Sequence, residues 1–116
     1  VLITARRLET VKWCEISPRS PATNLTVTGE FIHHGQIRSD RRYHLNVGGS
    51  FQNFGIVDVK DVTVGGDLLN EADWTAILTT MKGSSTRSVF GYFEGSVAVE
   101  PVALLLFGNL TITGEF

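Results

Sequence analysis

The chain has 116 residues, 10 basic and 12 acidic side chains, and a formal net charge of −2 at pH 7. This length suits one domain with its own apolar core. The low net charge argues against general electrostatic binding to nucleic acid or to an anionic membrane. Cys14 is the only cysteine, so a disulfide within the chain is excluded. No apolar run reaches the length of a membrane-spanning helix.

Residues 1–16 are strand-like, and Ser17–Pro21 predicts a loop because it contains two prolines and two serines. An octapeptide follows at residues 24–31 and returns at 109–116, with Ile112 in place of Val27 as the one difference. Both copies alternate apolar and polar residues, which predicts two strands of one type in one kind of environment. The side chains expected to face the core are Leu25, Val27, Phe31, Leu110, Ile112 and Phe116.

Residues 43–47 and 56–64 predict two further strands, each followed by a glycine pair. Within 56–64 the apolar positions move from odd to even numbers, so we expect a bulge or a turn at Lys60–Asp61. A glycine follows a strand-like run four times, which is typical of an antiparallel sheet with many turns. These glycines are Gly29, Gly48, Gly65 and Gly114.

One helix is predicted over about residues 70–82. Asn70 is a good N-cap, and acidic side chains follow it in the first turn. An apolar stripe at positions i, i+3, i+4 and i+7 then predicts a helix face packed on the core. The stripe consists of Trp74, Ile77, Leu78 and Met81.

Residues 88–99 predict another strand, and the run Val102–Phe107 is apolar on both faces. Such a run indicates a central strand or a strand buried by a neighbouring subunit. We therefore expect a mainly β fold: an antiparallel β-sandwich or barrel with one α-helix between strands. Residues 1–116 are expected to form this single β-rich domain.

The polar centre of the chain, residues 33–44, holds all three histidines. A metal site would combine His33 or His34 with His44 and Asp40, although adjacent histidines on a strand point to opposite faces. The alternative is that three arginines, together with His44, bind an anion or a neighbouring subunit, since guanidinium groups form bidentate hydrogen bonds to carboxylate and phosphate. These arginines are Arg38, Arg41 and Arg42.

No catalytic residue, metal or cofactor is predicted. Gly65–Gly66 lacks the Lys-Ser/Thr of a phosphate-binding loop, and the chain contains no Gly-x-Ser-x-Gly nucleophile motif. The acidic residues show no spacing that specifies a pair of glycosidase carboxylates. The chain is therefore not expected to be an enzyme.

Charge is distributed unevenly along the chain. Residues 1–44 carry seven basic and four acidic side chains, whereas residues 45–116 carry three and eight. This asymmetry suits head-to-tail contact between identical subunits, in which the arginines meet acidic side chains of a neighbour. The predicted interface residues are Val102, Leu104, Leu106, Asp58, Asp61 and Asp67.

The order of predicted elements and the small size are similar to those of phage particle proteins such as tail-tube subunits. We therefore predict a non-enzymatic structural subunit of a homo-oligomeric assembly, namely a virion (phage-type) particle or filament component, in a virion or an extracellular assembly. The principal partner would be the chain itself, and no membrane partner is expected.

The alternative is an OB-like module that binds single-stranded nucleic acid or another anionic ligand. Five strand-like segments with a helix before the fourth favour it, whereas the net negative charge disfavours nucleic acid. Its candidate surface combines basic and aromatic side chains: Arg38, Arg41, Arg42, Tyr43, Phe51 and Phe54.

Overall fold

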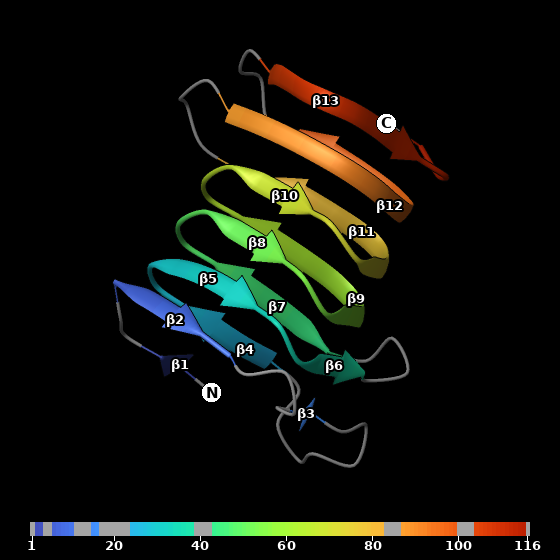
Figure 1. Cartoon of the computed structure of the whole chain (residues 1–116). Helices are drawn as coiled ribbons and strands as arrows, with labels where there is room; N and C mark the ends of the chain where they lie inside the picture. The colour runs from blue at the N-terminus through green and yellow to red at the C-terminus, as the bar shows by residue number, and fades with distance from the viewer. Residues whose placement is uncertain are drawn as a thin grey trace.

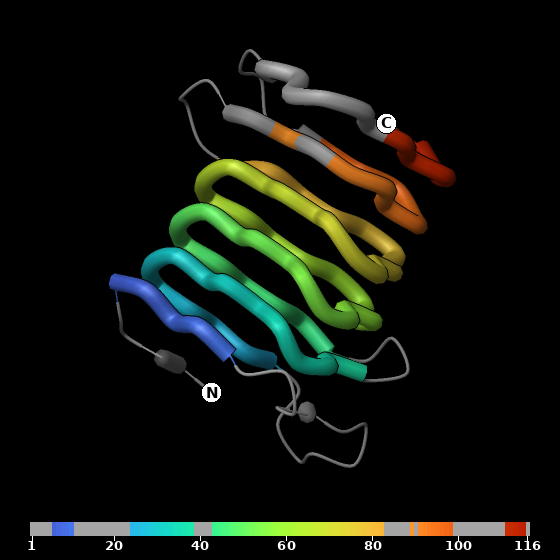
Figure 2. The backbone as a smooth tube through the Cα atoms, in the orientation of Figure 1, coloured from blue at the N-terminus to red at the C-terminus, as the bar shows by residue number. Residues whose placement is uncertain are grey.

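The computed structural model describes residues 2–3, 6–10, 15–16, 24–38, 43–82, 87–99 and 104–115. Within them the chain winds as a β-solenoid whose successive coils stack along one axis in chain order (Figures 1 and 2). The strands are β1 (Leu2–Ile3), β2 (Arg7–Glu9), β3 (Glu15–Ile16), β4 (Asn24–Val27), β5 (Glu30–His33), β6 (Gln36–Arg38), β7 (His44–Val47), β8 (Phe51–Asn53), β9 (Ile56–Val64), β10 (Leu68–Asn70), β11 (Asp73–Met81), β12 (Arg87–Val99) and β13 (Leu104–Ile112).

Each strand pairs in parallel with the equivalent strand of the next coil. Asn24 lies beside His44, and His44 lies beside Asp61. Equivalent positions in these coils are therefore 17 to 20 residues apart. Other register partners are farther apart, as Leu2 and Thr26 show, so the coils of this repeat vary in length. Every pairing between described strands follows the parallel pattern.

The coils build three stacks of strands. The first stack contains β1, β4, β7, the second halves of β9 and β11, and the end of β12. The second stack contains β2, β5, β8, β10 and the beginnings of β12 and β13. The third stack contains β3, β6, the first halves of β9 and β11, the middle of β12 and the end of β13.

The inward side chains of successive coils form columns in the core. Phe31 stacks on Phe51 with ring centroids 4.9 Å apart, and Phe51 lies 5.1 Å from Trp74. Phe93 continues this aromatic contact 5.3 Å from Trp74. Aliphatic columns of the first stack, such as Leu25–Leu45–Val62, are also buried. Because each coil covers the apolar face of its neighbour, the columns make one continuous core.

The two copies of the octapeptide occupy different stacks of the coil. Leu25, Val27 and Phe31 are buried, as predicted, and the first copy runs from the first stack around a corner into the second. In the second copy, Ile112 belongs to the third stack beside Phe93 and packs against the core. Leu110 is paired with Gly91, but its side chain and Phe116 lie outside the described part of the chain. The repeated octapeptide therefore encodes a strand followed by a corner, and the chain uses this unit at two different corners of the coil.

A ladder of buried polar side chains follows the end of the second stack. Asn53 donates from Nδ2 to Asn70 Oδ1 and to the Asp73 carbonyl, both at 2.9 Å. Asn70 donates likewise to the Tyr92 carbonyl at 2.7 Å. Each asparagine thus bonds to the backbone of the next coil, so the ladder holds neighbouring coils in register.

His33 occupies the ladder position before Asn53, with which it is paired in register. Its side chain is fully buried, its Nδ1 lies 2.8 Å from Thr10 Oγ1, and its Nε2 lies 3.1 Å from the Ile56 carbonyl. These contacts suit a neutral ring that donates from Nε2 and accepts the Thr10 hydroxyl at Nδ1. Desolvation by burial is the main reason that the pKa of His33 is lowered from 6.5 to about 4.

The predicted antiparallel sandwich or barrel is wrong, because the sheets are parallel. The glycines that suggested hairpins mark stacked corners of the coil instead. A Cβ at Gly48 would collide with the Thr28 carbonyl oxygen, and a Cβ at Gly65 would collide with the Gly48 carbonyl oxygen. Close stacking of consecutive corners therefore requires glycine there. The parallel pairing also excludes the OB-like fold, which is an antiparallel Greek-key barrel.

The predicted helix over residues 70–82 is also wrong, since β10 ends at Asn70 and β11 spans Asp73–Met81. Asn70 Oδ1 does accept the Ala72 N–H at 3.3 Å, but this bond forms a turn into a strand. The helix-like spacing arises where two period-2 segments meet at a corner. Trp74 and Met81 point into the core, whereas Ile77 and Leu78 are 52% and 39% exposed at that corner.

The parity change at Lys60–Asp61 was predicted as a bulge or a turn, and the burial pattern of β9 confirms the change. The inward positions are odd-numbered before Lys60 and even-numbered after Asp61. The first half of β9 pairs with β6 and the second half with β7. The strand therefore passes from the third stack to the first at this point.

We expect Thr79→Val to lower the free energy of unfolding by about 1–3 kcal/mol, because it leaves the buried indole N–H of Trp74 without a hydrogen-bond acceptor. The Trp74 indole N–H donates to Thr79 Oγ1 at 3.0 Å, and both side chains are buried. Urea denaturation measures the loss. Thr80→Val is the matched control, because Thr80 is the neighbouring half-buried position; equal losses in the two variants would contradict the role of this bond.

Candidate functional site

The predicted basic cluster is only partly described. Arg38 is exposed at the end of β6, and its register partner is Asp58 of the same chain. Arg41, Arg42 and Asp40 lie outside the described residues. Asp58, one of the carboxylates expected to meet Arg38 across a subunit contact, therefore lies beside Arg38 in the same chain.

The three histidines do not converge. His33 lies in the buried ladder, whereas His34 Nε2 lies 3.1 Å from a Glu9 carboxylate oxygen and its ring stacks on Phe54 at 5.1 Å. His44 Nδ1 lies 2.7 Å from Asp61 Oδ2. Among the described side chains, no group of three or more histidine, cysteine or acidic residues could hold a metal ion.

The predicted interface residues are spread over several elements. Asp58 and Asp61 lie in β9, and Asp67 is exposed before β10. Leu104 and Leu106 lie in β13, where they pair with Arg87 and Val89 of β12. Val102 lies outside the described residues. The subunit contact stays a prediction.

The outward side of the third stack carries a different set of polar and aromatic side chains. Tyr92 is 53% exposed, although it lies within β12 rather than at a turn. Its register partner on β13 is Thr111, and Glu94 is the next outward residue of β12. On β11, Thr75 pairs with Glu94, which places Asp73 beside Tyr92. Parallel strands about 4.8 Å apart therefore bring a tyrosine, two carboxylates and two threonines onto one surface.

A notch interrupts this surface where the third stack meets the first. Thr75 pairs with Glu94 and Leu78 pairs with Ser96, so Ala76 and Ile77 of β11 oppose only Gly95 of β12. Gly95 has φ +114°, and a Cβ there would collide with the Ala76 carbonyl oxygen. This bulge leaves an open notch of about 210 Å³. Its lining residues are Thr75, Ala76, Ile77, Glu94 and Gly95.

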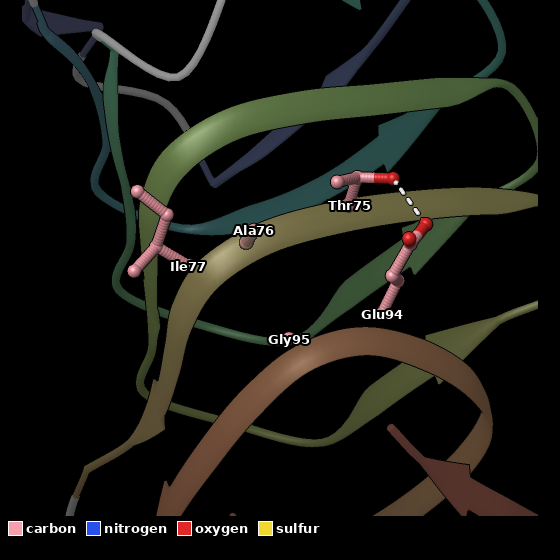
Figure 3. A pocket seen from close by; sticks show the side chains of 5 residues that line it. All are labelled: Thr75, Ala76, Ile77, Glu94 and Gly95. Atoms are coloured by element: carbon pink, nitrogen blue, oxygen red, sulfur yellow. Dashed lines mark hydrogen bonds between the residues drawn. The ribbon is translucent and has the colours of Figure 1, made fainter. Parts of the chain in front are cut away.

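The polar rim of the notch is held by a hydrogen bond between two strands. Thr75 Oγ1 donates to Glu94 Oε2 at 3.1 Å, and Figure 3 shows these two side chains pointing toward each other. Ile77 lies at the other end of the notch (Figure 3). The described charged side chains nearest to Tyr92 are the carboxylates of Asp73 and Glu94, whereas Arg38 and Lys60 lie with Asp58 on the earlier strands β6 and β9. The surface therefore offers hydrogen-bond acceptors and an exposed aromatic ring rather than an anion site.

Sequence reasoning missed this surface, which we call the third-stack surface. The alternation of side chains in a strand over residues 91–95 could have predicted that Phe93 points into the core and that Tyr92 and Glu94 point outward. Nothing in the linear pattern, however, places Asp73 or Thr75 beside them, because that proximity depends on the coil register. The helix predicted around Trp74 also assigned Ile77 to the core, whereas it is an exposed wall of the notch.

Comparison with known proteins identifies no relative: no family model, no curated protein and no solved structure matches the chain. No helix in the described part of the chain is long and apolar enough to cross a membrane.

Proposed function

We propose that this chain is a non-enzymatic β-solenoid module that binds a carbohydrate on its third-stack surface. The observation that carries the proposal is the exposed Tyr92 ring on the outer side of the third stack, next to Asp73, Glu94 and Thr111. The exposed tyrosine matters because its ring offers an apolar face for packing and its hydroxyl offers a hydrogen bond, the combination that enriches tyrosine at binding surfaces.

The chemistry of a sugar matches this arrangement. One face of a pyranose ring is rich in C–H groups and can pack on the tyrosine ring, whose hydroxyl stays in water. The hydroxyl groups of the sugar are donors, and carboxylates such as Asp73 and Glu94 are strong acceptors. Thr75 already orients the Glu94 carboxylate at 3.1 Å, which reduces the conformational entropy lost on binding.

The stacked coils support such a surface with a rigid frame. Phe93, which lies between Tyr92 and Glu94 on β12, is buried against Trp74. The Asn70 side chain also bonds to the Tyr92 carbonyl at 2.7 Å, so the buried ladder fixes the backbone of Tyr92. Side chains on a supported strand present a more defined surface than side chains on a loop.

We expect the chain to bind neutral oligosaccharides and Tyr92→Ala to weaken this binding about tenfold, through the loss of ring packing. Isothermal titration calorimetry with oligomers of glucose, mannose and N-acetylglucosamine measures the affinities. Phe54→Ala is the control, since Phe54 is 38% exposed in the corner between β8 and β9, away from Tyr92 in the sequence of coils, and its loss should leave binding intact. Absence of binding at millimolar sugar, or equal weakening by both variants, would sink the proposal.

The self-assembly expected from the charge asymmetry remains a separate prediction. Sedimentation of the chain under native conditions tests it without reference to sugar binding. A large assembly would support that expectation, and a monomer at high concentration would contradict it.

A further inference from the structure

The notch beside Tyr92 differs chemically from the rest of the third-stack surface. Ala76 and Gly95 bring little side-chain bulk, and Ile77, which is 52% exposed, supplies an apolar wall. At the opposite end, Thr75 and Glu94 form the polar rim (Figure 3). A substituent that fills the notch should therefore combine a small apolar group with a hydrogen-bond donor.

An acetamido group has both features. Its methyl group can cover the exposed side of Ile77, and its amide N–H can donate to the Glu94 carboxylate. An ionised carboxylate offers about four acceptor positions, and the Thr75 hydroxyl uses one of them at 3.1 Å. A simple hydroxyl substituent would make the polar contact but would leave the apolar wall in water.

We infer that the notch binds the acetamido group of an N-acetylhexosamine whose sugar ring packs on Tyr92. Tyr92 and Glu94 leave the same side of β12 two residues apart, about 6.7 Å along the strand. This separation lets one sugar ring lie on Tyr92 while its N-acetyl substituent reaches Glu94. The inference rests on the proposed function, because Tyr92 must first hold the ring in place.

The test compares three oligosaccharides of equal length by isothermal titration calorimetry with the full chain. They are oligomers of N-acetylglucosamine, of glucose, and of de-N-acetylated glucosamine. We expect the N-acetylated oligomer to bind about tenfold more tightly than the glucose oligomer, because its methyl group is buried against Ile77 whereas the glucose hydroxyl makes only the polar contact.

Ile77→Ser should abolish this preference while the affinity for the glucose oligomer stays unchanged. Leu78→Ser is the matched control, because Leu78 is the next residue, is 39% exposed and does not line the notch. This control should retain the tenfold preference. Loss of the preference in both variants would show that it does not arise from the notch wall, and would overturn the inference.

Three further outcomes are decisive. Equal affinity for the N-acetylated and glucose oligomers overturns the acetamido assignment, while the proposed function stands. Tightest binding of the de-N-acetylated oligomer, weakening with salt, shows an ammonium group paired with Glu94 and also overturns the assignment. Absence of binding for all three oligomers overturns the proposed function together with the inference.

Discussion

Asn53→Ala is expected to lower the free energy of unfolding by about 3–5 kcal/mol. The buried Asn53 side chain donates to Asn70 Oδ1 and to the carbonyls of Asp73 and Gly55. It also accepts the Gly55 N–H at 3.1 Å. Alanine would leave several buried polar groups without these partners and would open a cavity between two coils.

Urea denaturation at pH 7.5 measures this loss from the change in midpoint at constant slope. Gln52→Ala is the matched control, since Gln52 is the preceding residue on β8 and its side chain is half-buried on the outer side. We expect this control to change stability by no more than about 0.5 kcal/mol. A loss below 1 kcal/mol in Asn53→Ala would mean that the ladder does not hold the coils together.

Acid is expected to destabilise the fold through His33, by a total of about 3 kcal/mol between pH 6.5 and pH 4. Above pH 6.5 this histidine is neutral in both the folded and the unfolded chain. As the pH falls, the unfolded chain binds a proton that the folded chain excludes until about pH 4. The stabilising contribution is therefore complete above pH 6.5 and is lost as the pH falls through this window.

His33→Asn provides the test, because asparagine already occupies the equivalent ladder positions 53 and 70. The variant should fold, and its free energy of unfolding should not show the decline at low pH that His33 causes. The difference in free energy of unfolding between wild type and the variant should therefore change steadily from pH 7.5 to pH 4.5. His44→Asn is the control: His44 is half-exposed beside Asp61, so this variant retains the buried His33. Parallel stability curves for wild type and His33→Asn would show that His33 is not the source.

Asn70 shows how one local signal can precede either a helix or a strand. An N-cap asparagine and the asparagine of a turn both accept a nearby backbone N–H, and Asn70 accepts that of Ala72. The sequence could therefore predict a polar turn at Asn70. Only the pairing of β11 with β9 decides that a strand follows it, because the backbone bonds of β11 are made with another coil.

Prediction of the candidate site failed for a similar reason. The exposure of Tyr92 follows from simple alternation with the inward Phe93, but its neighbours come from β11 and β13. The notch arises because Gly95 alone opposes Ala76 and Ile77. A one-residue difference between neighbouring coils has no local signature, so it could not be found before the register was known.

The sequence by itself determined that Leu25, Val27 and Phe31 alternate into the core and that the chain turns at the glycines after the first strands. The alternation has a two-residue period and glycine marks these turns in the sequence, and both are local signals. The crowding that requires glycine at these corners comes from the stacking of coils. The tertiary structure decided that the strands stack in parallel, that Asn53 and Asn70 share one ladder, and that Tyr92 lies beside Asp73. Each of these features depends on hydrogen bonds between residues about one coil apart. The sequence could not predict them, because the alternation of side chains within a single strand is the same for parallel and antiparallel pairing.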